Sequence, residues 1–267
     1  MKLTQLVALM NTAGLTAAVT FPLLLSSLAL AGGTGKQEAD LHVSGGIAMP
    51  SAATSVFTNP AALVSSKQVL LDLQAGAADI WDHSIYRAGL RTGNGSFAAA
   101  GGVENRPGST NSSNQLSAYY GLAVGTQSFS FGVAGQTGIS SGGSQFNAGL
   151  LFQPTQALNL GFTARGLDSG PHEYGLGLAY DFASGVAFIL DSAADRHLKD
   201  IQFKPGLKVG NSDAALTLSY GTGDREEFSD GVSIGAVIHF KSSSSLELYY
   251  NPGNDLAHYY LALALGF

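Results

Sequence analysis

The chain has 267 residues, a formal net charge of −6, no cysteine and only 12% charged residues, against about 25% in ordinary globular proteins. The absence of cysteine excludes disulfides and thiolate metal sites, and an acidic balance without a basic patch argues against nucleic-acid binding. So small a charged share indicates that much of the protein surface does not face water.

Residues 1–31 have the layout of a secretory signal peptide. Lys2 is the single charged residue, an apolar run follows it, and the segment ends in a small-x-small pattern at Ala31, which is typical of signal-peptide cleavage. We therefore expect cleavage near Ala31. The alternative is a membrane anchor helix, because about 20 apolar residues span a bilayer, but Gly14 and Pro22 interrupt the run.

The next segment, 32–66, shows no sustained alternation of polar and apolar residues. It contains Asn59 followed by Pro60. Asn is a good N-cap because its side chain accepts a first-turn N–H, and Pro suits the first helical position because no N–H is needed there. We expect a short helical turn that begins at Asn59 and ends before Lys67.

From residue 67 to the end of the chain, apolar residues recur at every second position in short segments, the pattern of half-buried strands. The expected strands cover 69–75, 86–90, 97–103, 116–124, 129–133, 146–152, 158–164, 174–180, 186–190, 201–209, 214–220, 232–240, 246–250 and 256–267. Fourteen is an even number, as single-chain bacterial membrane barrels require. We predict an all-β fold, a transmembrane antiparallel β-barrel of 14 strands over 67–267, preceded by a short N-terminal plug over 32–66.

The connections between these strands alternate in length. Short polar turns cover 92–95, 124–127, 153–156, 181–184 and 210–213, and longer polar linkers cover 105–114, 138–144, 167–172, 192–199 and 222–230. Short turns at one rim and longer loops at the other are typical of membrane barrels. A soluble β-sandwich, the alternative for any one amphipathic strand, has no reason to keep this alternation.

The last strand ends on the last residue of the chain. One of its faces carries Tyr259, Leu261, Leu263, Leu265 and Phe267, and the other carries small or polar residues. A terminal strand of this kind resembles the barrel-closing strand of Gram-negative outer-membrane proteins, which the barrel assembly machinery reads during insertion. The alternative is an ordinary amphipathic strand of a soluble sheet.

The opposite faces of the strands carry polar and charged residues. The expected lumen charges are Asp72, Arg87, Arg91, Glu104, Arg165, Lys204, Lys208 and Glu247. Basic residues would cost about 2–4 kcal/mol at the lipid-facing midplane, so these side chains suit a wet lumen. A barrel of this size is wider than its own side chains can fill, so the lumen either conducts water or is closed by 32–66.

The chain has an Asn-Pro-Ala triplet, Asn59, Pro60 and Ala61, before fourteen amphipathic strands and a terminal Phe. This triplet resembles the hatch signature of the long-chain fatty-acid transporter (FadL/TodX-like) family of outer-membrane proteins. The chain looks like a small member. The resemblance implies a hatch inside a barrel, a location in the Gram-negative outer membrane, outer-membrane lipid and a hydrophobic small molecule as partners, and no cofactor. The alternative for the triplet is a plain capped helical turn.

The family releases its ligand sideways at an inward kink of the third strand. The matching strand here reads Ala100-Gly101-Gly102 at its centre, and a Gly pair permits a bulge or bend. The alternative is that small residues there make room for the hatch. Family members are also usually much longer, with large external loops, so surface capture of a fatty acid is in doubt for this chain.

We expect no metal site, because the six histidines lack metal-ligand spacing. We also expect that the protein is not an enzyme, because no serine lies in a nucleophile-elbow motif. The predicted function is passive uptake of small hydrophobic compounds, fatty-acid-like or aromatic, through a plugged barrel. Two alternatives stay open. One is a general polar porin, and the other is a structural barrel that holds a partner and does not transport.

Overall fold

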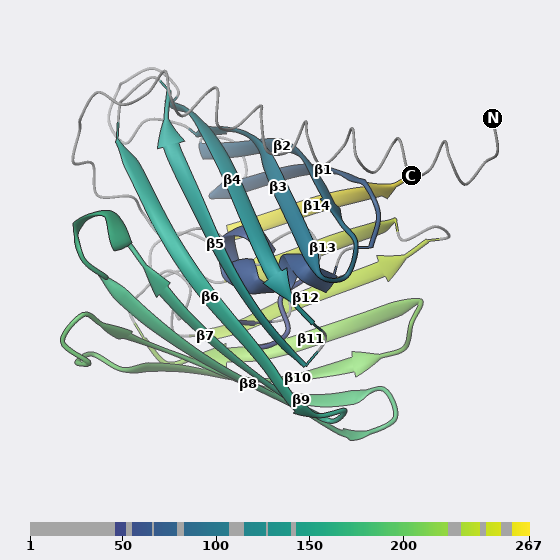
Figure 1. Cartoon of the computed structure of the whole chain (residues 1–267). Coiled ribbons are helices and arrows are strands. Elements are labelled where there is room, and N and C mark those ends of the chain that lie inside the picture. Colours follow the sequence, from purple (N-terminus) through teal and green to yellow (C-terminus); the bar gives the residue numbers. More distant parts are fainter. Residues whose placement is uncertain are drawn as a thin grey trace.

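The computed structural model describes residues 46–51, 55–65, 67–78, 83–106, 115–126, 128–139, 143–223, 231–240, 244–251 and 258–267. Fourteen antiparallel strands form one closed barrel in which β1 pairs with both β2 and β14 (Figure 1). This confirms the predicted fold class and the closing role of the last strand. The expected signal peptide, residues 1–31, lies outside the described residues.

The strands follow one another around the wall in sequence order. Their bounds are β1 Leu70–Ala78, β2 His83–Gly93, β3 Phe97–Arg106, β4 Gln115–Gly125, β5 Phe129–Gly138, β6 Ser144–Thr155, β7 Leu158–Arg165, β8 Glu173–Ala183, β9 Val186–Asp195, β10 Gln202–Gly210, β11 Ala214–Gly221, β12 Gly231–His239, β13 Ser245–Asn251 and β14 His258–Gly266. The helices are α2 Ser55–Thr58, η1 Pro60–Ser65 and η2 Leu167–Ser169.

The alternation in the sequence becomes two different faces of the wall. Along β8, Leu176 and Tyr180 are exposed on the outside, whereas Gly177 and Ala179 between them are buried. Side chains of a strand point alternately to opposite faces, so every strand contributes apolar residues to the outside. An apolar outside around a more polar interior is the arrangement of a barrel that spans a bilayer.

The short turns hold their strands together through side-chain bonds to the backbone. In the β2–β3 turn, the Oδ1 atom of Asn94 accepts hydrogen bonds from the N–H groups of Ser96 and Phe97, and Gly95 has a left-handed φ of 85°. In the β10–β11 turn, the Oδ1 atom of Asn211 accepts from Ala214 in the same way. Asn and Gly are the residues that such turns favour, so the local sequence fixes these connections.

Outward-facing aromatic residues lie toward both rims. Five tyrosines lie toward the rim with the longer loops and five phenylalanines toward the rim with the short turns, whereas Tyr180, Phe146 and Phe203 lie at the opposite rims. The tyrosines are Tyr86, Tyr174, Tyr220, Tyr250 and Tyr259, and the phenylalanines are Phe97, Phe129, Phe152, Phe182 and Phe240. Aromatic girdles at both interfaces are expected of a membrane barrel.

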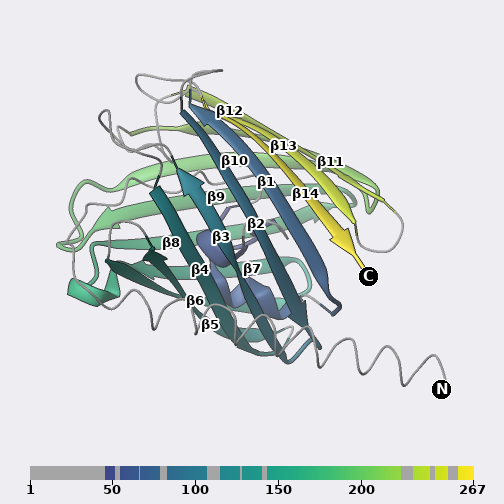
Figure 2. The same cartoon turned by 90° about the horizontal axis from the view of Figure 1, so that it is seen from above.

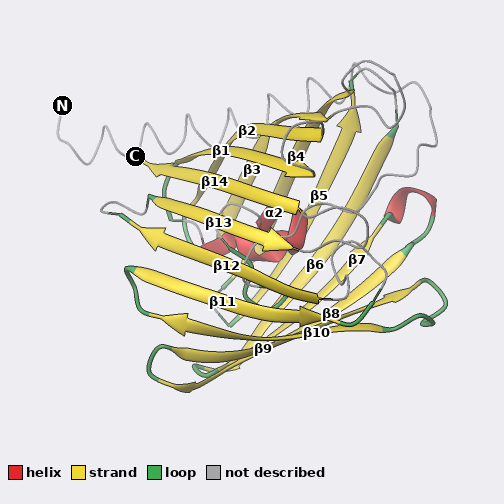
Figure 3. Ribbon diagram, turned by 180° about the vertical axis from the view of Figure 1, so that it is seen from behind, coloured by secondary structure: helices red, strands yellow, loops and turns green. Residues whose placement is uncertain are grey.

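Two short helical turns, α2 and η1, lie inside the barrel (Figure 3). The η1 turn begins after Asn59, whose Oδ1 atom accepts a hydrogen bond from the N–H of Ala61 at 3.2 Å. This confirms the expected helix start and cap. The preceding turn α2 was not predicted from the sequence, because Val56 and Thr58 are β-branched and favour helix weakly. Within the described residues, no helix has the length and apolarity to cross a membrane.

The outward face gives a first prediction about stability. Leu178→Arg places a cation at the middle of the outward face of β8 and should lower the free energy of unfolding by about 2–4 kcal/mol, whereas Phe182→Arg near the short-turn rim should cost about 0–1 kcal/mol. Urea unfolding in phospholipid vesicles measures both. Equal costs would contradict the assignment of this face to lipid.

Candidate functional site

The lumen contains part of the chain itself. We call residues 46–51 and 55–65 the inner segment, and its helical turns are enclosed by the strands (Figures 2 and 3). Val56, Phe57 and Leu63 are buried in one apolar cluster with Ala98 and Ala100 of β3. The segment before the first strand therefore occupies the barrel interior, as the predicted fold class required.

Asn59 joins the inner segment to itself and to the wall. Its Nδ2 group donates to the carbonyl of Ile47 at 2.9 Å and to the carbonyl of Leu150 in β6 at 3.1 Å, and its Oδ1 caps η1. The side chain is fully buried, so its hydrogen-bonding capacity must be met locally. Asn59 does more than cap a helix, because it also ties together the two described parts of the inner segment.

Pro60 and Ala61 lie directly against the barrel wall. The carbonyl of Ala61 accepts a hydrogen bond from the hydroxyl of Ser130 in β5 at 3.0 Å. A β-carbon built on Gly132, also in β5, would lie 2.3 Å from the carbonyl carbon of Pro60. The structure thus places the Asn-Pro-Ala triplet inside the barrel in contact with β5 and β6. Its role as a family signature stays a prediction.

Four glycines line the wall where the inner segment touches it, and we call Gly132, Gly149, Gly161 and Gly177 the glycine wall. They pair across neighbouring strands, Gly132 with Gly149 and Gly161 with Gly177. A β-carbon on any of them would come within 2.6 Å of an inner-segment atom. The inner segment can lie this close because these positions carry no side chain.

The first part of the inner segment is held by Asp191 of β9. The Oδ1 atom of Asp191 accepts a hydrogen bond from the N–H of Ile47 at 2.9 Å. Gly46 before it has a left-handed φ of 73° and lies against the same carboxylate, where a β-carbon would come within 2.2 Å. Glycine is therefore required at position 46 both by its backbone conformation and by space.

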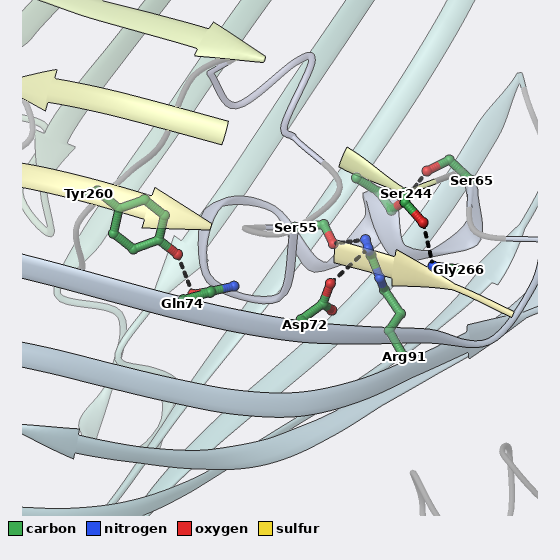
Figure 4. A network of polar contacts seen from close by, with 9 residues as sticks. Ser55, Ser65, Asp72, Gln74, Arg91, Ser244, Tyr260 and Gly266 are labelled. Carbon is green, nitrogen blue, oxygen red and sulfur yellow. Dashed lines mark hydrogen bonds and ion pairs between the residues drawn. The ribbon is translucent and has the colours of Figure 1, made fainter. Parts of the chain in front are cut away.

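Two arginines of β2 reach α2. The guanidinium of Arg87 lies 3.9 Å from the centre of the Phe57 ring, a cation–π contact, and Phe57 also packs on the Tyr119 ring. Arg91 lies between the carboxylate of Asp72 and the hydroxyl of Ser55, at 3.4 Å from each (Figure 4). Charges of the wall thus fix the orientation of α2.

A second set of contacts runs across the lumen on the side of the longer loops. We call it the lumen belt, and its members are Gln74 (β1), Arg87 (β2), Glu104 (β3), Gln136 (β5), Lys204 (β10), Tyr249 (β13) and Tyr260 (β14).

One half of the lumen belt joins β10 to β1. The ammonium of Lys204 donates to the hydroxyl of Tyr249 at 2.6 Å. Tyr249 and Tyr260 belong to one buried apolar cluster, and the hydroxyl of Tyr260 bonds to the Oε1 atom of Gln74 (Figure 4). Lys204 and Tyr249 come from strands that are not neighbours, so this contact crosses the inner faces of β11 and β12.

The other half of the lumen belt joins β1 to β5. Arg87 donates to Gln74 and forms an ion pair with Glu104, and Gln136 donates to the second oxygen of Glu104 at 2.7 Å. Glu104 is 0% exposed. A buried carboxylate is tolerated only when it is paired and hydrogen-bonded, and this one has both kinds of partner.

The remaining predicted lumen charges also face inward. Arg165 forms an ion pair with Glu173 at 3.0 Å, Lys208 lies 3.8 Å from the sulphur of Met49 in the inner segment, and Glu247 is 1% exposed. The predicted set therefore lines the lumen, but it does not converge on one point.

The third strand has no β-bulge at its glycine pair. β3 keeps an uninterrupted register with β2 and with β4 through Ala100, Gly101 and Gly102. Gly102 instead makes room for Tyr119, whose ring a β-carbon there would meet at 2.6 Å, and Ala100 makes room for the inner segment. The small residues serve packing, and a lateral exit at this strand stays a prediction.

Sequence reasoning missed several residues of the site, namely Ser55, Phe57, Asp191 and the glycine wall. Phe57 and Ser55 lie in a stretch without periodicity, so no pattern identified α2. The glycines carried a usable signal, because each stands at an inward position of an alternating strand, and neighbouring strands repeat it. Gly inside a strand marks a close approach of another backbone.

A shallow groove of about 560 Å³ lies on the wall around the β1–β14 seam, lined by residues that include Ala75, Tyr86, Leu248, Tyr250 and Leu261. These side chains belong to the outward, apolar set. The β1–β14 and β13–β14 ladders keep their register across it, so the groove is a feature of the outer surface and no strand pair is broken there.

The described residues contain no group of His, Asp or Glu side chains placed to hold a metal ion. Three of the histidines, His172, His197 and His239, are exposed. The expectation that the chain is not an enzyme stays a prediction.

The glycine wall predicts the effect of adding a side chain. Gly132→Val should displace the inner segment, because the valine β-carbon would overlap the backbone of Pro60. A backbone atom cannot rotate away as the end of a flexible side chain can. In a chain without other cysteines, a reporter Ala61→Cys is buried and should react with a maleimide only when Gly132→Val is also present. Ala148→Val, on the outward face of β6, is the matched control and should leave the reporter protected. Protection in both variants would contradict the contact.

The buried ion pair predicts a difference in stability between two carboxylates. Glu104→Gln removes the charge of the carboxylate that pairs with Arg87 in a buried site and should lower the free energy of unfolding by about 3 kcal/mol or more. Glu173→Gln breaks the partly exposed pair with Arg165 and should cost about 1 kcal/mol or less. Urea unfolding of both variants in lipid vesicles tests this, and equal costs would refute the burial of Glu104.

No protein-family model and no curated protein sequence matches this chain. Among solved structures, it is similar to the toluene transporter TbuX of Ralstonia pickettii, with a TM-score of 0.56 and 10% identity over 91% of this chain and 100% of that chain. A mutant of the Rh. blastica porin gives a TM-score of 0.45 at 8% identity over 75% of this chain and 99% of that one. The KdgM porin gives 0.44 at 9% identity, over 74% and 99%. The likeness to TbuX establishes the barrel fold alone, and the porin scores are too low to add to it.

Proposed function

We propose that this protein is an outer-membrane channel for the passive uptake of small hydrophobic compounds, fatty-acid-like or aromatic, and that the inner segment closes its lumen at rest. The proposal includes cleavage of residues 1–31 and insertion by the barrel assembly machinery. TbuX, whose barrel fold this chain shares, is a toluene transporter, which is consistent with the proposal.

The observation that carries the proposal is the burial of the lumen charges. Arg91 is 1% exposed and Glu104 is 0% exposed, and both are engaged with neighbours in the wall or the inner segment. In a general polar pore, such side chains line a water-filled channel and remain hydrated. A lumen closed by its own chain is better suited to a selective solute than to free passage of ions and sugars.

The wall beneath the inner segment favours an uncharged or largely apolar solute. Where Val56, Phe57 and Leu63 pack, the facing wall is largely apolar: it includes Tyr119 and alanines such as Ala98 and Ala100, with the guanidinium of Arg87 beside them. Displacing the inner segment would uncover this surface. A hydrophobic molecule can replace the apolar contacts that are lost, and each buried CH₂ contributes about 0.8 kcal/mol, whereas a sugar or an ion cannot.

Uptake in cells tests the proposal. The unmodified chain is expressed in a Gram-negative host without its own outer-membrane transporters for hydrophobic compounds, and uptake of radiolabelled toluene, oleate and maltotriose is compared with an empty-vector strain. We expect faster uptake of toluene or oleate and unchanged uptake of maltotriose.

Faster maltotriose uptake would instead support a general polar porin. No change for any solute, together with a stable partner that co-purifies, would support a structural barrel. Either result would overturn the proposal.

A further inference from the structure

The lumen belt and the inner segment form two layers along the barrel. Ala100 and Gly132 contact the inner segment, and Glu104 and Gln136 of the belt lie four residues farther along the same strands, toward the longer loops. Four residues of a strand span about 13 Å. Along β3 and β5, a molecule that comes from the loop side therefore meets the belt before the inner segment. On β8 and β9 the inner segment reaches farther toward the loops, because Ile47 lies against Gly175 and Asp191.

The contact between Lys204 and Tyr249 is the part of the belt that reaches across the lumen. β11 and β12 separate the two strands, and their inward residues below the contact are small, among them Thr217 and Gly235. Besides the 2.6 Å hydrogen bond, the Lys204 ammonium lies 5.4 Å from the centre of the Tyr249 ring. A charge-assisted hydrogen bond is stronger than a neutral one, so this bridge closes space that the small residues leave open.

We propose that the Lys204–Tyr249 bridge is an access filter, a second closure in series with the inner segment that determines which solutes reach it. This inference rests on the proposed function. A solute must part Lys204 from Tyr249, and the faces then uncovered are the rings of Tyr249 and Tyr260 next to a fixed positive charge. An apolar or aromatic molecule packs on those rings, whereas a hydrated ion cannot replace the contacts between them.

Arg87 belongs to both layers. It bonds to Gln74 and Glu104 in the belt and stacks on Phe57 in the inner segment. Movement of Phe57 therefore removes one of the partners that hold Arg87 in place. The two closures remain separate barriers, but the position of one affects the bonds of the other.

Potassium conductance of full-length variants in planar bilayers tests the access filter. Gly132→Val serves as the background that loosens the inner segment, as checked by labelling of the Ala61→Cys reporter. In this background we expect little conductance while the bridge is intact. Adding Lys204→Met, which keeps the side-chain length but removes the ammonium, should raise conductance roughly tenfold, the effect expected from losing one charge-assisted hydrogen bond.

Two further variants serve as controls in the same background. Lys208→Met removes a lysine from the same strand whose ammonium lies near Met49 of the inner segment, not near Tyr249. It should raise conductance much less than Lys204→Met, because the inner segment is already loosened in this background. Lys204→Arg restores the positive charge and a donor and should return conductance toward the background level.

The access filter is overturned if Gly132→Val alone conducts as well as the double variant, if Lys208→Met has the same effect as Lys204→Met, or if the double variant stays closed although the reporter is labelled. None of these outcomes bears on toluene or oleate uptake by the unmodified chain. Failure of the filter is therefore distinguishable from failure of the proposed function.

Discussion

The arrangement of the lumen depends on the absence of β-carbons at the glycine wall. Only where Gly132 and Gly149 expose bare backbone can Pro60 and Asn59 approach closely enough for Asn59 to reach the carbonyl of Leu150. Once the inner segment lies there, Phe57 falls beneath Arg87 and Ser55 beside Arg91. The polar contacts between the inner segment and the wall therefore depend on the space left by the four glycines.

The inner segment also changes what the charges of the wall do. In an open pore, Arg87 and Glu104 would interact mainly with water and ions, and their mutual attraction would be weak. Enclosed with Phe57 and Gln136, they form a buried pair in which each charge needs the other. In this barrel, residues of the kind that line a polar pore hold the interior together.

Much of the architecture could be read from the sequence, because period-two alternation and alternating loop lengths are local properties. Leu261 and Leu263 face out and Ala262 faces in as the pattern demands. The pair Gly101-Gly102 was compatible with a bend or with close packing, because glycine signals both. The structure has no bulge there, and a β-carbon on Gly102 would meet the carbonyl oxygen of Ala88 on β2 at 2.3 Å and the ring of Tyr119 on β4 at 2.6 Å. The contacts of Asp191 and of Lys204 with residues distant in sequence could not be predicted, since they depend on where the inner segment lies and on how strands face each other across the lumen.

The seam between β1 and β14 constrains the order of folding. It joins the first strand of the barrel to the last, from Leu70 opposite Gly266 to Ala78 opposite His258, so the ladder cannot close before the end of the chain is available. Such non-local pairing is slow to form, because the chain loses entropy in bringing distant segments together before their contacts stabilise the pair. The inner segment immediately precedes β1 and ends up enclosed. Its contacts with β5, β6 and β9 join strands from different parts of the wall through one short stretch of chain.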